Sequence, residues 1–372
     1  MNILIYSFVG DTHPHYVTWA LRQLGHQVET CSVAGLSAHL RSSQRIGAAG
    51  GASFHVRNQD EGVVTSEPDV VWVRRIGSYA AIADDIHPSD REVALREAQR
   101  FADGAVSWFD DTAFCVNPGR VRRHANSKAI QLKVARTCGL DIPETLISND
   151  PDAIRDFWND HNKHIIYKPF LQAAWTDGEN TMNIYTSILP EHLMSNDKAL
   201  SSTPGIYQPY IDKAYELRVV FMGDTCITAR LDTQVDSRLS RDWRSGNQYK
   251  FKVSPDTLPE NIREKCKNFM ESIGIVFGSF DFIVTPGGDH IMLEVNEQGQ
   301  FLWLEDRCTD IPMLDAFSRF LISQDKNFVY KPSDQQFTMA DCARVNDVKI
   351  ALHRSRTQNP DGRAYGIAVG KI

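Results

Sequence analysis

The segment from residue 278 to residue 300 carries two carboxylates and an amide at a spacing that suits a metal site. Apolar runs flank Pro286-Gly287-Gly288, and a Gly-Gly pair between such runs is typical of a tight β-hairpin. If the two glycines form the centre of the turn, Asp281 lies directly opposite Glu294. Asn296 then shares their face, because side chains alternate along a strand. The segment thus predicts three oxygen-bearing side chains on one face of a hairpin.

Two carboxylates opposed in this way are only about 5 Å apart and repel each other, and we expect that only a bound cation offsets this repulsion. Oxygen ligands without Cys or His favour magnesium, which keeps several waters and commonly binds through one or two carboxylates plus substrate phosphates. The alternative is an edge hairpin with a solvated acidic face, and a shift of one residue would remove the pairing. The alternation places Met292 on the polar face, opposite an apolar face of Phe280, Phe282, Val284, Ile291, Leu293 and Val295.

Two lysines are candidates for binding an anion. Lys168 lies inside an otherwise apolar strand predicted over residues 165–169, where an ammonium must either find a partner or shift its pKa. Lys128 falls in the first turn of a helix predicted over residues 126–139, where a cation opposes the helix dipole unless an anion is bound. For Lys168 alone, the ordinary alternative is an edge residue whose ammonium extends to the surface. For Lys128 alone, it is a solvated helix residue.

A second polar pair lies on a predicted strand. An apolar stretch with one amide, residues 207–211, precedes Glu216 and Arg218, which project to the same face because they are two residues apart. Such a pair is usually a surface ion pair that contributes little to stability. Asp242 and Arg244 flank a tryptophan, and they indicate either a turn or a contact to a substrate.

The elements that position these residues follow an α/β order. Strands are predicted at residues 2–6, 27–31 and 69–73, with a helix through residues 17–24 between the first two. The first strand-to-helix turn lacks G-x-G-x-x-G, which argues against a dinucleotide-binding domain. Residues 36–62 are rich in Ser, Gly and Ala and predict a long irregular connection.

The composition limits the classes of function. The chain has 372 residues, 42% hydrophobic and 23% charged, as in soluble globular proteins with two or three domains. Its net charge of -7 argues against a general nucleic-acid binder. No apolar run is long enough to span a membrane, and the first residues lack the features of a signal peptide. The seven cysteines are scattered, which predicts reduced thiols in the cytoplasm rather than disulfides or a zinc site.

The order of these features resembles that of the ATP-grasp fold over roughly residues 117–305. A helix lysine, a strand lysine, an apolar stretch with an amide, a Glu-x-Arg strand and an acidic hairpin ending in Glu-x-Asn follow one another. The most specific segments resemble those of ATP-grasp ribosomal peptide maturases, the graspetide synthetases of the microviridin type. These segments are VWVRRIG (71–77), SKAIQLKVARTCGLDIPETLISNDP (127–151), YTSIL (185–189), YQPYIDKAYELRVVFMGD (207–224), RDWR (241–244) and FGSFDFIVTPGGDHIMLEVNEQGQFLWLE (277–305).

The resemblance implies an α/β (α+β) fold, namely an ATP-grasp fold preceded by an α/β domain. The implied division is an N-terminal substrate-side domain at 1–116, a central ATP-grasp subdomain at 117–195 and a C-terminal subdomain with the metal hairpin at 196–325. Residues 326–372 form a tail without a place in the pattern.

The resemblance also implies roles for single residues. Lys128 and Lys168 would contact the phosphates of ATP, with Lys168 also near the base, and Arg218 would approach the transferred phosphoryl group. Glu216 would approach the ribose or the metal. The remaining roles are adenine contacts for Gln208, Pro209 and Ile211, magnesium binding for Asp281, Glu294 and Asn296, and substrate contacts for Arg74, Arg75, Asp242 and Arg244.

The implied activity is that of an ATP- and Mg²⁺-dependent ligase, which forms an acyl-phosphate and joins it to a hydroxyl or amine. The implied substrate is a ribosomally made precursor peptide. One alternative is a standalone amino-acid or small-peptide ligase of the glutamate-adding type, whose substrate is a small amine or carboxylate. Another is a nucleotide-binding scaffold without turnover. Ester and amide products both stay open, and a homodimer is among the oligomeric states that the sequence leaves open.

Overall fold

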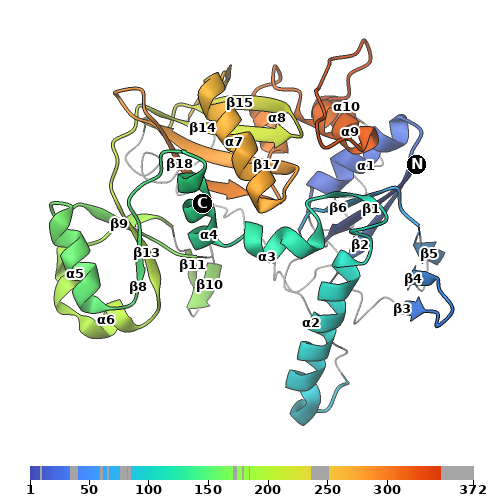
Figure 1. Ribbon diagram of the computed structural model, residues 1–372, viewed down its shortest axis with the longest axis horizontal. Helices are drawn as coiled ribbons and strands as arrows, with labels where there is room; N and C mark the ends of the chain where they lie inside the picture. Colours follow the sequence, from blue (N-terminus) through green and yellow to red (C-terminus); the bar gives the residue numbers. More distant parts are fainter. Residues whose placement is uncertain are drawn as a thin grey trace.

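The computed structural model describes residues 1–8, 11–33, 41–58, 62–64, 67–75, 82, 85–170, 174–177, 180–183, 185–235 and 251–344. A five-stranded sheet lies at the centre, with the N-terminal sheet on one side of it and a small four-stranded sheet on the other (Figure 1). This arrangement confirms the predicted mixed α/β class. Within the described ranges, no helix combines the length and the apolar character needed to cross a membrane.

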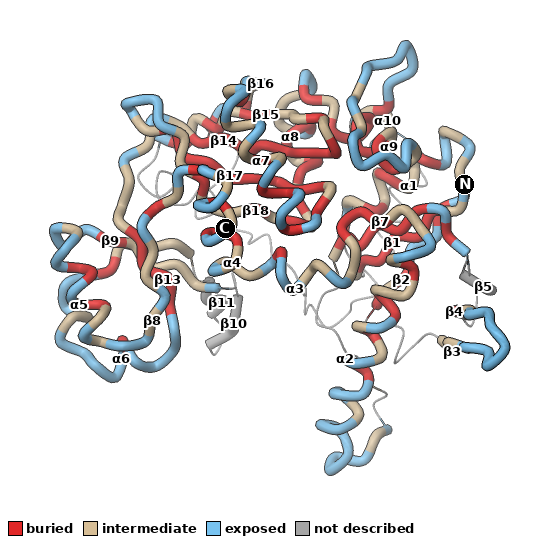
Figure 2. The backbone as a smooth tube through the Cα atoms, in the orientation of Figure 1, coloured by how far each residue is buried: buried red, intermediate tan, exposed pale blue. Residues whose placement is uncertain are grey.

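The N-terminal sheet is parallel, with the strand order β2-β1-β6-β7. Its central strands are continuous apolar runs because helices cover both faces. Ile3 and Ile5 pack in a core with α1, whereas Leu4 and Tyr6 pack in a core with the C-terminal half of α2. The N-terminal half of α2 projects away from the body and is exposed (Figure 2). The elements are β1 (Asn2–Ser7), α1 (His13–Gln23), β2 (Gln27–Ser32), β6 (Val70–Val73), η2 (Pro88–Asp90), α2 (Arg91–Ser107) and β7 (Phe114–Val116).

The prediction of an irregular connection over residues 36–62 is wrong for the part that the structure describes. That part forms an antiparallel sheet of β3 (Arg41–Ile46), β4 (Ala52–Asn58) and β5 (Gly62–Val64). Phe54 and Val56 of β4 are buried against the core beside α2, so two apolar side chains attach this sheet to the domain.

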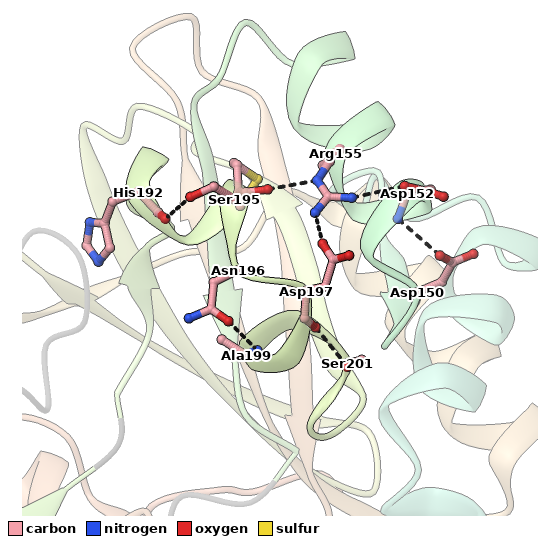
Figure 3. Close-up of polar contacts among 10 residues, drawn as sticks. Asp150, Asp152, Arg155, His192, Ser195, Asn196, Asp197, Ala199 and Ser201 are labelled. Atoms are coloured by element: carbon pink, nitrogen blue, oxygen red, sulfur yellow. Dashed lines mark hydrogen bonds and ion pairs between the residues drawn. The ribbon is translucent and has the colours of Figure 1, made fainter.

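The small sheet has the order β12-β9-β13-β8 and is covered by α5 and α6. Arg155 of α5 holds the segment before α6, because its Nε donates to the Met194 carbonyl at 2.8 Å and its guanidinium pairs with Asp152 and Asp197 (Figure 3). The strands that carry Lys168 and Gln208 pack on these helices, because Ile165 and Tyr207 share a core with α5 and α6. The elements are β8 (Leu146–Ser148), α5 (Pro151–Asp160), β9 (Ile165–Lys168), β10 (Ala174–Asp177), β11 (Asn180–Asn183), β12 (Ser187–Ile188), η4 (Glu191–Ser195), α6 (Asp197–Ser201) and β13 (Gly205–Pro209).

The central sheet is antiparallel, with the order β16-β15-β14-β17-β18. Helices α4 and α7 cover one face, while α8 and α9 share a core with part of the other (Figure 1). The elements are η3 (Gly119–Val121), α3 (Arg122–Ala125), α4 (Lys128–Thr137), β14 (Tyr215–Met222), β15 (Thr225–Leu231), β16 (Val253–Asp256), α7 (Glu260–Ile273), β17 (Phe277–Val284), β18 (His290–Asn296), α8 (Leu302–Arg307) and α9 (Met313–Ser323).

The β17–β18 hairpin contains the predicted pairing of Asp281 with Glu294, although its turn differs from the prediction. The loop has three residues, Pro286 to Gly288, and Gly288 adopts a φ of 91°. This longer loop shifts the register by one residue near the turn, and a bulge at Leu293 restores it. Between the turn and the bulge, Met292 lies opposite Phe282 in the core and Ile291 lies opposite Ile283, so the predicted faces of Met292 and Ile291 are wrong.

The described part of the tail packs onto the body. Residues 326–330 run beside the β14–β15 turn, where the N–H groups of Asp224 and Thr225 donate to the Phe328 carbonyl at 3.0 and 2.9 Å. The last described element is α10 (Met339–Arg344), whose Met339 N–H donates to the buried Glu305 carboxylate at 2.6 Å. This portion therefore completes the core beside α8 and α9.

Candidate active site

Three of the predicted residues form a row across the central sheet. Arg218 of β14 is in register with Asp281 of β17, which is in register with Glu294 of β18. Arg218 and Asp281 are 2% and 7% exposed, and Nη1 of the arginine lies 2.6 Å from Oδ1 of the aspartate. Glu294 forms an ion pair with Lys128 of α4. Each carboxylate of the opposed pair thus has a cationic partner, so the expectation that only a bound cation could offset their repulsion is wrong.

Gln131 explains how Lys128 reaches Glu294, which lies 166 residues further along the chain. The Gln131 side chain is fully buried, and its amide donates to the Ala125 and Val295 carbonyls at 2.6 and 2.9 Å. Its carbonyl oxygen accepts the Val295 N–H at 3.1 Å. These bonds attach the first turn of α4 to β18. Neither Gln131 nor its role was predicted, because a single glutamine in a helix gives no sequence signal.

The oxygen-bearing side chains fit a magnesium ion. Asp281 and Glu294 lie opposite each other in the β17–β18 ladder, and Asn296, two residues after Glu294, shares their face. Ser279, opposite Asn296, is fully buried, and its hydroxyl finds no hydrogen-bond partner among the residues described. Within the same residues there is no group of three or more His, Cys, Asp or Glu that could hold a metal by itself. Two carboxylates and an amide therefore suit an ion that takes its other ligands from water and phosphates.

Glu216 is buried and binds Lys213 and Thr233, not Arg218, the partner expected for a surface Glu-x-Arg pair. Its carboxylate is 5% exposed and accepts from Lys213 Nζ at 2.6 Å and from Thr233 Oγ1 at 2.9 Å. Burial raises the pKa of Glu216, although the charge of Lys213 opposes this shift. The ordinary interpretation as a surface pair with Arg218 is therefore wrong. Lys213 was missed, although it directly precedes this strand in the sequence.

The two strands of the small sheet bring Lys168 and the apolar stretch together. Lys168 is half-buried at the end of β9, in register with Ile206 of β13, and Gln208 is in register with Ile166. The Gln208 amide donates to Thr145 Oγ1 at 2.9 Å, and its side-chain oxygen has no hydrogen-bond partner within the described part of the chain. Pro209 ends the strand, and Ile211 follows it, half-buried.

The N-terminal domain contributes Arg74, which lies against the segment after β18. Arg74 is 1% exposed, and its Nη1 donates to the Gln298 carbonyl at 2.9 Å. Burial lowers the pKa of Arg74 to about 10, although Asp11, whose Oδ2 lies 3.3 Å from the Arg74 Nε, opposes the shift. The neighbouring Arg75 lies over the Phe8 ring, 5.5 Å from its centroid. The other two predicted substrate contacts, at positions 242 and 244, lie outside the described residues.

Comparison with known proteins identifies the fold. The structure is similar to a RiPP-associated ATP-grasp ligase from Chryseobacterium gregarium, with a TM-score of 0.79, 22% identity and coverage of 88% of this chain and 99% of that one. It is also similar to the macrocyclases MdnC and MdnB from Microcystis aeruginosa MRC. For MdnC the TM-score is 0.76 with 28% identity, and the match covers 87% of this chain and 100% of that one. For MdnB the TM-score is 0.71 with 26% identity, and the match covers 86% of this chain and 99% of that one.

These structures confirm the resemblance that the sequence indicated, and the chain has the ATP-grasp fold. The Chryseobacterium ligase was solved in complex with ADP and a leader and core peptide, and MdnC was solved with its precursor peptide MdnA. No protein-family model matches the sequence, and no curated protein matches it.

Proposed function

We propose that this protein is an ATP-dependent ligase that activates a side-chain carboxylate of a ribosomally made peptide and joins it to a hydroxyl or an amine. The observation that carries the proposal is the continuous row of Arg218, Asp281, Glu294 and Lys128 across β14, β17, β18 and α4. Similarity to ligases solved with ADP and precursor peptides over most of this chain supports the peptide as substrate.

In the proposed reaction, an oxygen of the peptide carboxylate attacks the γ-phosphorus of ATP, and the bond to the bridging oxygen of ADP breaks. The hydroxyl or amine then attacks the acyl carbon, loses its proton, and inorganic phosphate leaves. This route needs no nucleophilic Ser or Cys, so positioning and electrostatic stabilisation supply the catalysis.

Each element of the site has a part in holding the nucleotide. Lys128 and Lys168 bind phosphates, and Arg218 binds the phosphoryl group during transfer. Gln208, Pro209 and Ile211 border the adenine, where a proline still offers its carbonyl oxygen, and Glu216 approaches the ribose or the metal. Asp281, Glu294 and Asn296 hold magnesium, which neutralises charge on the β- and γ-phosphates when it is bound.

The proposal includes the substrate side and the division of the chain. Arg74, Arg75, Asp242 and Arg244 are proposed to contact the peptide, and the three arginines suit its carboxylates because guanidinium groups pair with carboxylates. The proposed boundaries at residues 116 and 325 are supported by the ends of β7 at Val116 and of α9 at Ser323, whereas the boundary at residue 195 separates β13 from β8 and β9, with which it pairs. A cytoplasmic location is supported by seven cysteines that are all free thiols.

The proposed reaction predicts its products. With ATP, magnesium and an acidic precursor peptide encoded beside the gene, ADP and inorganic phosphate should form in equal amounts, because the lysines and Arg218 surround the terminal phosphates. Hydroxylamine should trap the activated peptide as a hydroxamate, which mass spectrometry detects. Formation of AMP and pyrophosphate instead would show that the acyl-phosphate route is wrong, and turnover with a free amino acid alone would favour a small-molecule ligase.

Lys168→Met should weaken ATP binding without unfolding the protein. Methionine keeps most of the apolar stem and removes the charge, so the binding free energy should fall by about 1 to 3 kcal/mol, the range for charge-assisted hydrogen bonds. Isothermal titration calorimetry measures this loss. Lys198→Met on the exposed face of α6 is the matched control and should bind ATP normally. Equal affinities for the wild type and Lys168→Met would remove Lys168 from the nucleotide site.

A further inference from the structure

His13 connects the first helix to the segment that follows β18. Its Nε2 accepts the backbone N–H groups of Phe301 and Leu302 at 3.3 and 3.4 Å, and its ring packs edge-on against the Phe301 ring. A ring nitrogen that accepts hydrogen bonds carries no proton, so the proton lies on Nδ1, which is 3.4 Å from Asp11 Oδ1. Burial and the charge of Arg74 lower the pKa of His13 to about 4, which agrees with a neutral ring.

Asp11 orients two side chains toward this segment. It accepts the His13 backbone N–H at 3.1 Å and the Ser7 hydroxyl at 3.2 Å, and it pairs with Arg74. Burial alone would raise the pKa of Asp11, but Arg74 and His13 outweigh it and hold the pKa well below its usual range. The Asp11 carboxylate is therefore charged, and it fixes both His13 and Arg74, whose other end binds the Gln298 carbonyl.

The β18–α8 connection, residues 297–301, is also the support of Arg218. While Nη1 of Arg218 binds Asp281, its Nη2 donates to the Gln300 carbonyl at 3.1 Å. Gly299 next to it has a φ of 53°, and a Cβ atom there would lie 2.7 Å from the Phe277 ring. The connection is thus held by His13, Arg74 and Arg218, which each bind its backbone.

We propose that His13 is a positioning residue for the phosphoryl transfer, because it fixes the β18–α8 connection and thereby the Gln300 carbonyl that orients Arg218. His13 acts through the backbone and does not touch the substrate. The inference rests on the proposed function, since Arg218 is taken as the group that binds the transferred phosphoryl. A displacement of such a group by a fraction of an ångström lowers the rate of the chemical step more than the affinity for substrates.

The test compares a substitution that removes the acceptor with one that keeps an acceptor. His13→Phe keeps a ring of similar size and removes the acceptor, so kcat should fall on the order of 10- to 100-fold while KM for ATP and peptide changes by less than about twofold. His13→Gln keeps an acceptor oxygen and should restore most of kcat. His124→Phe, an exposed histidine of α3, is the matched control and should behave as the wild type. If His13→Phe does not fold, His13→Asn replaces it, because the shorter amide falls short of the two N–H groups.

Hydrogen–deuterium exchange over residues 297–302 measures the position of the connection without turnover. Exchange there should rise in His13→Phe and return in His13→Gln, with the rest of the protein unchanged. An unchanged kcat in folded His13→Phe, or unchanged exchange at this segment, would overturn the positioning role while leaving the ligase proposal intact. A wild type that releases no ADP with peptide would overturn the ligase proposal, and the exchange data would still decide whether His13 holds the connection.

Discussion

Glu294→Gln is expected to abolish turnover while the protein stays folded. Glutamine has nearly the same shape as glutamate, but it loses the negative charge that pairs with Lys128 and that would bind magnesium. Loss of one preorganised electrostatic group at a phosphoryl-transfer site lowers kcat on the order of 100- to 1,000-fold. ADP release under saturating ATP and peptide measures the effect, and circular dichroism with thermal unfolding checks the fold.

Two controls separate the metal from a general loss of charge. Glu271→Gln on the exposed face of α7 should leave the rate unchanged. The magnesium concentration needed for half-maximal ATP binding should rise in Glu294→Gln, whereas it should stay normal if the glutamate only held Lys128. Turnover of Glu294→Gln at the wild-type rate would contradict the assignment of this carboxylate to the metal site.

The sequence predicted the carboxylate pair of the acidic hairpin but not the details of its turn and register. Alternation and the glycines predicted that Asp281 faces Glu294, and the structure has this pair. The turn and the bulge were not predicted, because a bulge adds one residue without any characteristic side chain. The two differences shift the register in opposite directions and cancel at the carboxylates. Between the turn and the bulge, Met292 enters the core and Ile291 lies opposite Ile283, away from the apolar face predicted for it.

The partners of the site residues could not be predicted, because they are distant in the sequence. Lys128 and Glu294 meet only because Gln131 binds the backbone of β18. Likewise, Asp11 and His13 lie after the first strand, and nothing in that stretch indicates a contact with residues 301–302. Spacing along one strand is encoded locally, whereas packing between elements follows from the whole fold.

The sheet formed by β3 and β4 was missed for a compositional reason. Its residues are mostly polar, and among those whose burial the structure describes, Phe54 and Val56 are the ones buried against the domain. Patterns of strands in sequence rest on apolar alternation over several residues. A strand that buries two side chains beside a Gly-rich turn resembles a loop by composition, so its pairing becomes visible only in the structure.

Arg218→Leu should lower kcat far more than it raises KM. The guanidinium binds Asp281 and the Gln300 carbonyl in the free enzyme, and its charge is needed most when the phosphoryl group separates from ADP. We expect kcat to fall on the order of 100- to 1,000-fold, with KM for ATP changed by only a few fold. Steady-state kinetics with the peptide and ATP varied separately give both values.

The same substitution also leaves Asp281 buried without its cation, which destabilises a folded protein by about 3 to 5 kcal/mol. Arg218→Lys separates the two effects, because lysine keeps the charge beside Asp281 but cannot bind two groups through a planar fork. It should recover much of the lost stability in urea unfolding while kcat stays well below that of the wild type. Arg230→Leu on the adjacent strand β15 is the control. Arg230 lies in register with Leu217 and pairs with Asp232, and its replacement should leave kcat unchanged. If Arg218→Lys regained the full rate, a positive charge alone would be sufficient at this position, and the geometry that links Arg218 to Asp281 and Gln300 would have no part in the transfer.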